Sequence, residues 1–116
     1  MAALVRQGFA GNNFRLSAFA LGNGENVTVT NSVVVGLEGD PFVDRSGFHW
    51  PESAGAVWTF ENNIAHNNEV GGIFVWQNNE LPHVIDGFIA YYNDDAGVEH
   101  GAYTNSYVYK NLVLRN

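Results

Sequence analysis

Aromatic rings, carboxylates and imidazoles recur beside short apolar segments of this chain. Phe74 and Trp76 offer flat apolar faces of the kind that stack on the C–H surface of a pyranose ring. Carboxylates accept hydrogen bonds from sugar hydroxyls, so aromatic rings with acids nearby are typical of a sugar-binding site. We therefore predict a carbohydrate-binding face made of His49, Phe74, Trp76 and Glu99, with Arg45, Glu69, Asp94 and Asp95 at its edge.

The acids of this face could also be catalytic. Glycoside hydrolysis needs two carboxyl groups across the scissile bond, and Asp94 or Asp95 with Glu69 or Glu99 could supply them. However, the chain has no Gly-x-Ser-x-Gly, no His-Glu-x-x-His and no phosphate-binding loop. Adjacent acids in a turn are more often solvated than bound to calcium. We predict a binding protein without catalytic residues, metal or cofactor, and keep a polysaccharide hydrolase or lyase as an alternative.

Charge and composition exclude several kinds of partner. The 116 residues include 12 acidic and 5 basic ones, which gives a net charge of -7, and the basic residues are scattered. Nucleic-acid binding needs a basic patch, so we expect no nucleic-acid partner. The absence of cysteine excludes disulfides and thiolate metal sites. No apolar run approaches the ~18 residues of a spanning helix, and no signal-peptide pattern is present. We expect a soluble protein, cytoplasmic by default, with no membrane partner.

Two columns of apolar residues return at matching steps, which identifies an internal repeat. The first column is Val5, Val29, Phe60, Val84 and Val108, and the second is Ala10, Val34, Ala65, Ile89 and Val113. Both have steps of 24, 31, 24 and 24 residues, so one unit carries an insertion of seven, which we place in a loop at 36–46. Repeats of this length bury their apolar faces by stacking on neighbouring units. The chain 1–116 is therefore predicted to be a single repeat domain.

Each unit contains three short segments with strand character. β-Branched and aromatic residues alternate with polar ones, and Asn, Asp or Gly separate the segments, which predicts strands joined by sharp corners. First strands are predicted at 26–30, 57–61, 83–86 and 106–110, and second strands at 33–35, 64–66, 88–90 and 112–114. Third strands are predicted at 47–50, 72–75 and 97–100, each opening with glycine. Alternation then points Trp50, Val75 and His100 inward, and His49, Phe74 and Glu99 outward.

Three strands and three corners in each unit, without helical periodicity, predict an all-β parallel solenoid with layers about 4.8 Å apart. The segment Phe-Glu-Asn-Asn-Ile-Ala-His-Asn-Asn at 60–68, followed by Gly-Gly-Ile-Phe-Val at 71–75, resembles the right-handed parallel β-helix repeat of pectate-lyase-like enzymes and phage tailspikes. The stretch 58–79 is also similar to coils of large secreted proteins that bind or depolymerise hyaluronan. The resemblance implies a short right-handed single-stranded parallel β-helix of about 4–5 coils, with the active groove on the face of the third strands. A lyase of that family would need calcium-binding acids and a basic residue, and only Arg45 lies nearby.

The predicted ends of the stack suggest an alternative function. Neither end shows a helical or polar cap, so open strand edges and apolar core would be exposed there. We predict that another copy of the chain covers these uncapped ends, or that the chain belongs to a longer solenoid. Leu37, Phe42 and Val43 lie outside the repeat in the 36–46 loop and could form a flap or a subunit contact. Self-assembly into a homo-oligomer is therefore the alternative to a carbohydrate-binding module.

Overall fold

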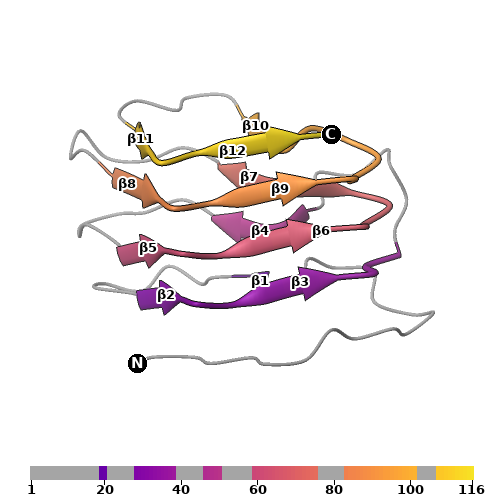
Figure 1. Cartoon of the computed structure of the whole chain (residues 1–116), viewed down its shortest axis with the longest axis horizontal. Helices are drawn as coiled ribbons and strands as arrows, with labels where there is room; N and C mark the ends of the chain where they lie inside the picture. The colour runs from indigo at the N-terminus through magenta and orange to yellow at the C-terminus, as the bar shows by residue number, and fades with distance from the viewer. Residues whose placement is uncertain (1–18, 21–27, 39–45, 51–58, 76–82, 102–106) are drawn as a thin grey trace.

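The structure is a computed structural model, and it describes residues 19–20, 28–38, 46–50, 59–75, 83–101 and 107–116. This described part consists of parallel strands in three four-stranded sheets (Figure 1), with no helix that could cross a membrane. The first sheet contains β2 (Thr28–Thr30), β5 (Thr59–Glu61), β8 (His83–Asp86) and β11 (Tyr107–Lys110). The second contains β3 (Val33–Val35), β6 (Ile64–His66), β9 (Ile89–Tyr91) and β12 (Val113–Arg115). The third contains β1 (Phe19–Ala20), β4 (Ser46–Trp50), β7 (Gly71–Val75) and β10 (Val98–His100).

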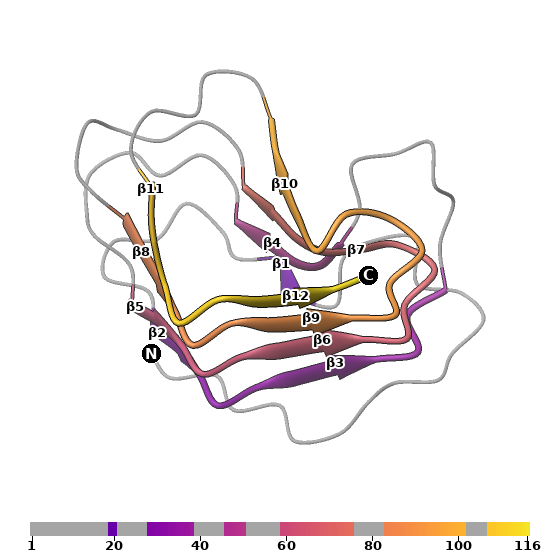
Figure 2. The ribbon, with the colours of Figure 1, turned by 45° about the horizontal axis from the view of Figure 1, so that its top comes forward.

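The chain enters the three sheets in the same order each time. Strands β2, β3 and β4 lie in the first, second and third sheets, and β5, β6 and β7 repeat that order, as do β8, β9 and β10. We call each such passage a layer, and β11 with β12 forms the last described one. Strands of adjacent layers pair in parallel, so the layers lie on top of one another (Figure 2). This arrangement confirms the predicted all-β parallel architecture and is compatible with a parallel β-helix.

Residues with a left-handed backbone form the corners between strands. After the first strand of successive layers they are Asn31, Asn62, Gly87 and Asn111, with φ of 52°, 55°, 66° and 49°. After the second strand they are Gly36, Asn67 and Tyr92, with φ of 68°, 53° and 51°. Glycine and asparagine adopt this conformation readily, so they are well suited to corners. Among these corner residues, Tyr92 is the one that is neither glycine nor asparagine.

Alternation along the strands fills the space between the three sheets. The middle residues of β3, β6 and β9 are Val34, Ala65 and Ala90, and they are only 4%, 0% and 0% exposed. Larger side chains from the other sheets complete the core. Phe48 meets Phe60 edge to face with 5.2 Å between ring centroids, and it meets Phe88 in the same way at 6.0 Å. Edge-to-face pairs add about 0.5–1.5 kcal/mol to the effect of burial.

The pairing between the β5–β6–β7 and β8–β9–β10 layers corrects the predicted apolar columns. Phe60 pairs with Ile85 and Ala65 pairs with Ala90, one residue later than expected. Ile85 and Ala90 are fully buried, whereas the strand residues before them are half-buried. A shift of one residue exchanges the two faces of a strand. The prediction was therefore wrong for four residues that lie on outer faces rather than in the core: Val84, Ile89, Val108 and Val113.

Buried asparagines connect successive layers at the corner between the second and third sheets. The Oδ1 atom of Asn68 accepts the backbone N–H of Leu37 at 2.9 Å, and its Nδ2 donates to Oδ1 of Asn93 at 2.7 Å. Asn93 in turn donates from Nδ2 to the carbonyl oxygen of Ala65 at 3.1 Å. Because these amides are buried, loss of one leaves its partners unsatisfied away from water. The polar corners therefore hold the layers together as well as turning the chain.

Two further predictions need correction. Leu37, expected outside the repeat, is only 6% exposed and belongs to the core cluster. His100 lies in register with Trp50 and Val75 as expected, but it is exposed, because β10 is the outermost strand of its sheet in the described part. Most of the predicted insertion loop, residues 39–45, lies outside the described residues.

Candidate functional site

The predicted binding face lies on the third sheet, where three of its residues form one column. His49 pairs with Phe74, and Phe74 pairs with Glu99. Phe74 lies outside the core cluster but is only 2% exposed, and the His49 ring packs edge to face against it with 5.2 Å between ring centroids. Phe74 is therefore covered, which corrects its predicted role as an accessible platform for a sugar. His49 and Glu99 are half-buried, and the predicted residues Trp76 and Arg45 lie outside the described residues.

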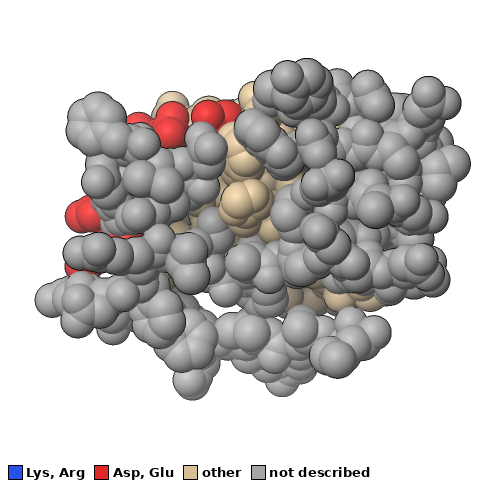
Figure 3. All heavy atoms as spheres, turned by 180° about the vertical axis from the view of Figure 1, so that it is seen from behind, with Lys and Arg blue, Asp and Glu red and all other residues tan. Residues whose placement is uncertain are grey.

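The predicted acids lie at the corner between the second and third sheets. The N–H groups of Glu69 and Asp94 each donate to a carbonyl of the preceding layer at 2.9 Å, in equivalent bonds. Glu38, Glu69 and Asp94 therefore occupy equivalent positions of successive layers, and all three are exposed. We call them the acidic column. Asp95, next to it, is also exposed. In the view from behind, acidic side chains of the described part gather toward one edge (Figure 3).

The outer face of the second sheet carries an apolar and aromatic surface. Since the middle residues of β3, β6 and β9 face the core, the first and last residues of these strands face outward. One outward column contains Val33, Ile64, Ile89 and Val113, and the other contains Val35, His66, Tyr91 and Arg115. The outward residues of the first sheet are more polar and include Thr30, Glu61, Asp86 and Lys110. The second sheet therefore presents the face better suited to an apolar or ring-shaped ligand.

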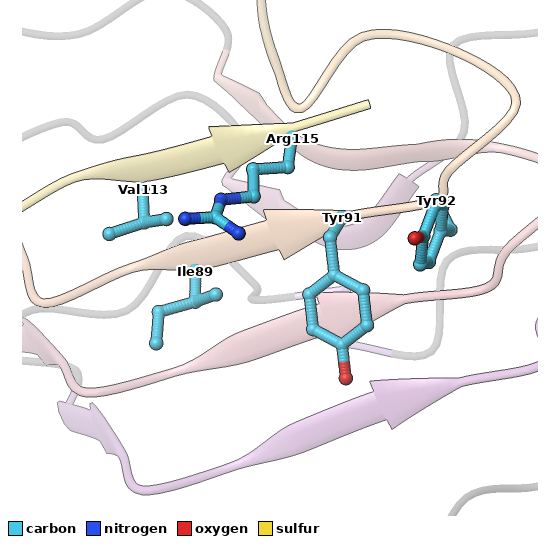
Figure 4. A pocket seen from close by; sticks show the side chains of 5 residues that line it. All are labelled: Ile89, Tyr91, Tyr92, Val113 and Arg115. Carbon is cyan, nitrogen blue, oxygen red and sulfur yellow. The ribbon is translucent and has the colours of Figure 1, made fainter.

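A pocket of 340 Å³ opens on this face (Figure 4). Its lining consists of Ile89, Tyr91, Tyr92, Val113 and Arg115. Ile89 and Val113 project from β9 and β12 as neighbours in register, and Arg115 extends from β12 toward β9. The two tyrosines lie at the other end of the pocket in this view. The site thus combines an apolar surface, two phenol rings and one guanidinium group.

Tyr92 has an unfavourable backbone conformation at this pocket. Its φ of 51° lies in the left-handed region, where the equivalent corner residues are Gly36 and Asn67. For a residue other than glycine, asparagine or aspartate, this conformation costs roughly 1–2 kcal/mol. The side chain is 72% exposed, so burial contributes little in return. A strained and exposed aromatic residue is more readily explained by function than by stability.

Neighbouring rings fix the orientation of the tyrosines. His66, one layer away, stacks on Tyr91 with 4.6 Å between ring centroids and 4° between ring planes. Nδ1 of His66 lies 2.7 Å from Oδ1 of Asn67, a hydrogen bond that restrains the imidazole. The rings of Tyr91 and Tyr92 lie 5.7 Å apart at 78°. Two nearly perpendicular rings therefore meet edge to face and form a corner.

Arg115 supplies the positive charge of the site. It is exposed, and no carboxylate in the described ranges forms an ion pair with it. Its backbone carbonyl accepts the N–H of Tyr92 at 3.2 Å, so β12 and the Tyr92 corner are joined directly. A guanidinium group donates a planar pair of N–H groups that matches carboxylate, sulfate or phosphate oxygens.

A second group of titratable rings extends from the buried His83 to the exposed His100, between the first and third sheets. Ring centroids of Trp50, His83 and Tyr107 lie 5.5–5.6 Å apart, and Oη of Tyr109 is 2.5 Å from Nε2 of His100. Burial lowers the pKa of both histidines and raises the pKa of both tyrosines. These rings are therefore neutral near pH 7, which suits packing rather than acid–base chemistry. Within the described residues, no group of three or more His, Asp or Glu side chains could hold a metal ion.

The pocket was missed because its strands were assigned to the wrong face. A signal for the correct alignment was present in the glycines Gly47, Gly72 and Gly97, which open the third strands at steps of 25 residues. Applied to the second strands, the step of 25 aligns His66 with Tyr91 and Asn67 with Tyr92. That alignment would have placed both tyrosines on the surface.

No protein-family model, curated protein or solved structure matches this chain. Its function therefore has to be inferred from the geometry of the site.

Proposed function

We propose that this chain is a carbohydrate-binding module that uses the pocket on the outer face of the second sheet. The observation that carries the proposal is Tyr92, an aromatic side chain that is 72% exposed and has a left-handed backbone where equivalent corners have Gly or Asn. Such a residue lowers stability without filling the core. A ligand that stacks on its ring provides the compensating role.

The shape of the pocket favours a sugar over a flat or extended apolar ligand. Tyr91 and Tyr92 meet at 78°, so one ring can stack on a pyranose face while the other lies along its edge. Both phenol groups donate and accept hydrogen bonds, as sugar hydroxyls require. The volume of 340 Å³ lies at the small end of the about 300–1,000 Å³ range of ligand pockets, which suits one or two sugar rings.

The same proposal includes the finer description of the fold. We propose a short right-handed single-stranded parallel β-helix, of the kind found in pectate-lyase-like proteins. Its support is the repeated order of the three sheets, the parallel pairing of each strand with its equivalent and the left-handed corners. In this fold the outward face of a sheet repeats one side-chain position in every layer, which is how His66 comes to stack on Tyr91.

The test is a glycan array followed by calorimetric titration of the strongest hit. Tyr92→Asn restores the residue type of the equivalent corner at Asn67, so the variant is expected to fold. We expect this variant to lose about 5- to 12-fold in affinity, the effect of removing a stacked ring worth about 1–1.5 kcal/mol. Glu99→Gln, on the third sheet, is the control and should bind as the wild type does. Absence of any glycan hit, or equal binding by Tyr92→Asn, would contradict the proposal.

Self-assembly is the second candidate, because the last described layer exposes apolar side chains. Leu114 pairs with Ala90, yet it is 46% exposed whereas Ala90 is fully buried. A second copy stacked in register on this layer would cover Leu114. Sedimentation equilibrium at micromolar concentration should then show a dimer or larger assembly, and Leu114→Asp should shift it to the monomer. A wild-type monomer at all concentrations would remove this candidate.

A further inference from the structure

We propose that the pocket selects glycans carrying one isolated anionic substituent, which Arg115 binds. This inference rests on the proposed function, since it names the ligand class of the same site. The substituent is a carboxylate, sulfate or phosphate group, because all three present paired oxygens to the guanidinium fork. A polyanionic chain is excluded by the charges beside the pocket.

The guanidinium of Arg115 has apolar neighbours in the pocket. It lines the pocket with Ile89 and Val113, whose apolar side chains offer its guanidinium no hydrogen-bond partner. No acid of the described part pairs with it, although the chain has 12 acidic residues against 5 basic ones. An exposed arginine on an apolar face, with no carboxylate of the described part paired to it, is available to an incoming anion.

Arg115 lies beside the two tyrosines that would hold the sugar. Arg115 is in register with Tyr91 one layer away, and Tyr92 donates its backbone N–H to the carbonyl of Arg115. Adjacent strands lie about 4.8 Å apart. A group attached directly to a sugar that stacks on the tyrosines therefore lies within reach of the guanidinium. This geometry favours an anionic substituent on the bound sugar itself over one on a distant unit.

The acidic column disfavours glycans that carry more than one anionic group. Glu38, Glu69 and Asp94 lie at the corner that follows the second sheet, and Asp94 is two residues after Tyr92. The backbones of these three residues follow one another at about the 4.8 Å spacing between strands, and the screening length near 0.1 M salt is about 10 Å. A polyanionic chain crossing the tyrosine corner would meet this column within the screening length. One anionic group facing Arg115 points away from that edge and avoids the repulsion.

The experiment compares three classes of glycan on the native chain. An array is assembled from neutral oligosaccharides, from the same oligosaccharides with a single carboxylate, sulfate or phosphate, and from polyanionic chains. Calorimetry then measures the best singly charged glycan and its neutral parent with wild type, Arg115→Gln and Arg115→Lys. Lys110→Gln removes the same charge from an exposed site on the first sheet and is the matched control.

We expect the singly charged glycan to bind at least about tenfold more tightly than its neutral parent, and polyanionic chains to bind less than either. Arg115→Gln should abolish this preference and leave affinity for the neutral parent within twofold. Arg115→Lys should keep part of the preference for the singly charged glycan, and Lys110→Gln should keep all of that preference. Equal binding of the charged and neutral glycans, with Tyr92→Asn still weakening both, would overturn this inference while the proposed function stands. Absence of binding to every class would overturn both.

Discussion

Among the described glycines, Gly72 leaves the least room for a Cβ atom, and this predicts how two glycine substitutions should differ. A Cβ atom on Gly72 would overlap the backbone carbonyl oxygen of Gly97 and lie 3.0 Å from the Cβ of Ala90. A Cβ atom on Gly97 would instead meet the end of the Leu114 side chain at 2.8 Å. Because Leu114 is 46% exposed, its side chain has room to move aside. The backbone of Gly97, held by strand pairing, does not.

The magnitudes follow from this difference. Overpacking typically costs about 1–3 kcal/mol, and overlap with a fixed backbone atom places Gly72→Ala at the upper end, about 3 kcal/mol; the loss of glycine entropy in the unfolded chain returns about 0.4–1 kcal/mol. Gly72→Ala should therefore lower the free energy of unfolding by about 2 kcal/mol or more. With a urea m-value of about 2 kcal/mol/M, the unfolding midpoint falls by about 1 M. Gly97→Ala should stay within about 0.5 kcal/mol of the wild type, because displacing an exposed side chain costs little.

Urea unfolding followed by circular dichroism measures both variants. The m-value should remain unchanged, since neither substitution alters the surface exposed on unfolding. The stacking of β7 on β10 would be refuted if Gly72→Ala were as stable as Gly97→Ala. A third variant, Gly36→Asn, separates packing from backbone conformation. Gly36 has a φ of 68° and open space around it, so asparagine should be tolerated within about 1 kcal/mol.

Three further outcomes are expected. Tyr92→Asn should match or exceed the thermal midpoint of the wild type, because it relieves about 1 kcal/mol of backbone strain; a large loss in differential scanning calorimetry would assign Tyr92 to packing. Asn68→Ala should lower the free energy of unfolding in urea by about 2–3 kcal/mol, since it leaves the Leu37 N–H and a buried amide unpaired. Burial lowers the pKa of His83 below its ordinary 6.5, so the unfolded chain binds more protons and stability should fall as pH drops through 6.5. His83→Gln should flatten that dependence in urea titrations between pH 5 and pH 8, and an unchanged slope would contradict it.

The repeat period predicted the order of the sheets, but strand composition left the register open. Val84 and Ile85 are both apolar, so alternation alone does not say which of them faces the core. The structure shows that Ile85 faces the core, because it is fully buried and pairs with Phe60 of the preceding layer. The third strands were placed in the correct register because Gly72 and Gly97 lie at or beside their starts, 25 residues apart. Glycine therefore located the layers better than the aliphatic residues did.

The candidate site was less predictable than the fold, since exposure depends on what covers a face. The column of His49, Phe74 and Glu99 was predicted correctly, yet Phe74 is only 2% exposed, and alternation along a strand does not say whether an outward side chain is covered. Tyr92 could not be interpreted until its corner was aligned with Asn67. Only then does an aromatic residue in a left-handed position stand out.

A crystal structure of the chain with its strongest array glycan tests the central claim most directly. We expect a sugar ring stacked at the corner of Tyr91 and Tyr92, with any anionic substituent within hydrogen-bonding distance of Arg115. A sugar bound instead beside His49 and Glu99 on the third sheet would contradict it.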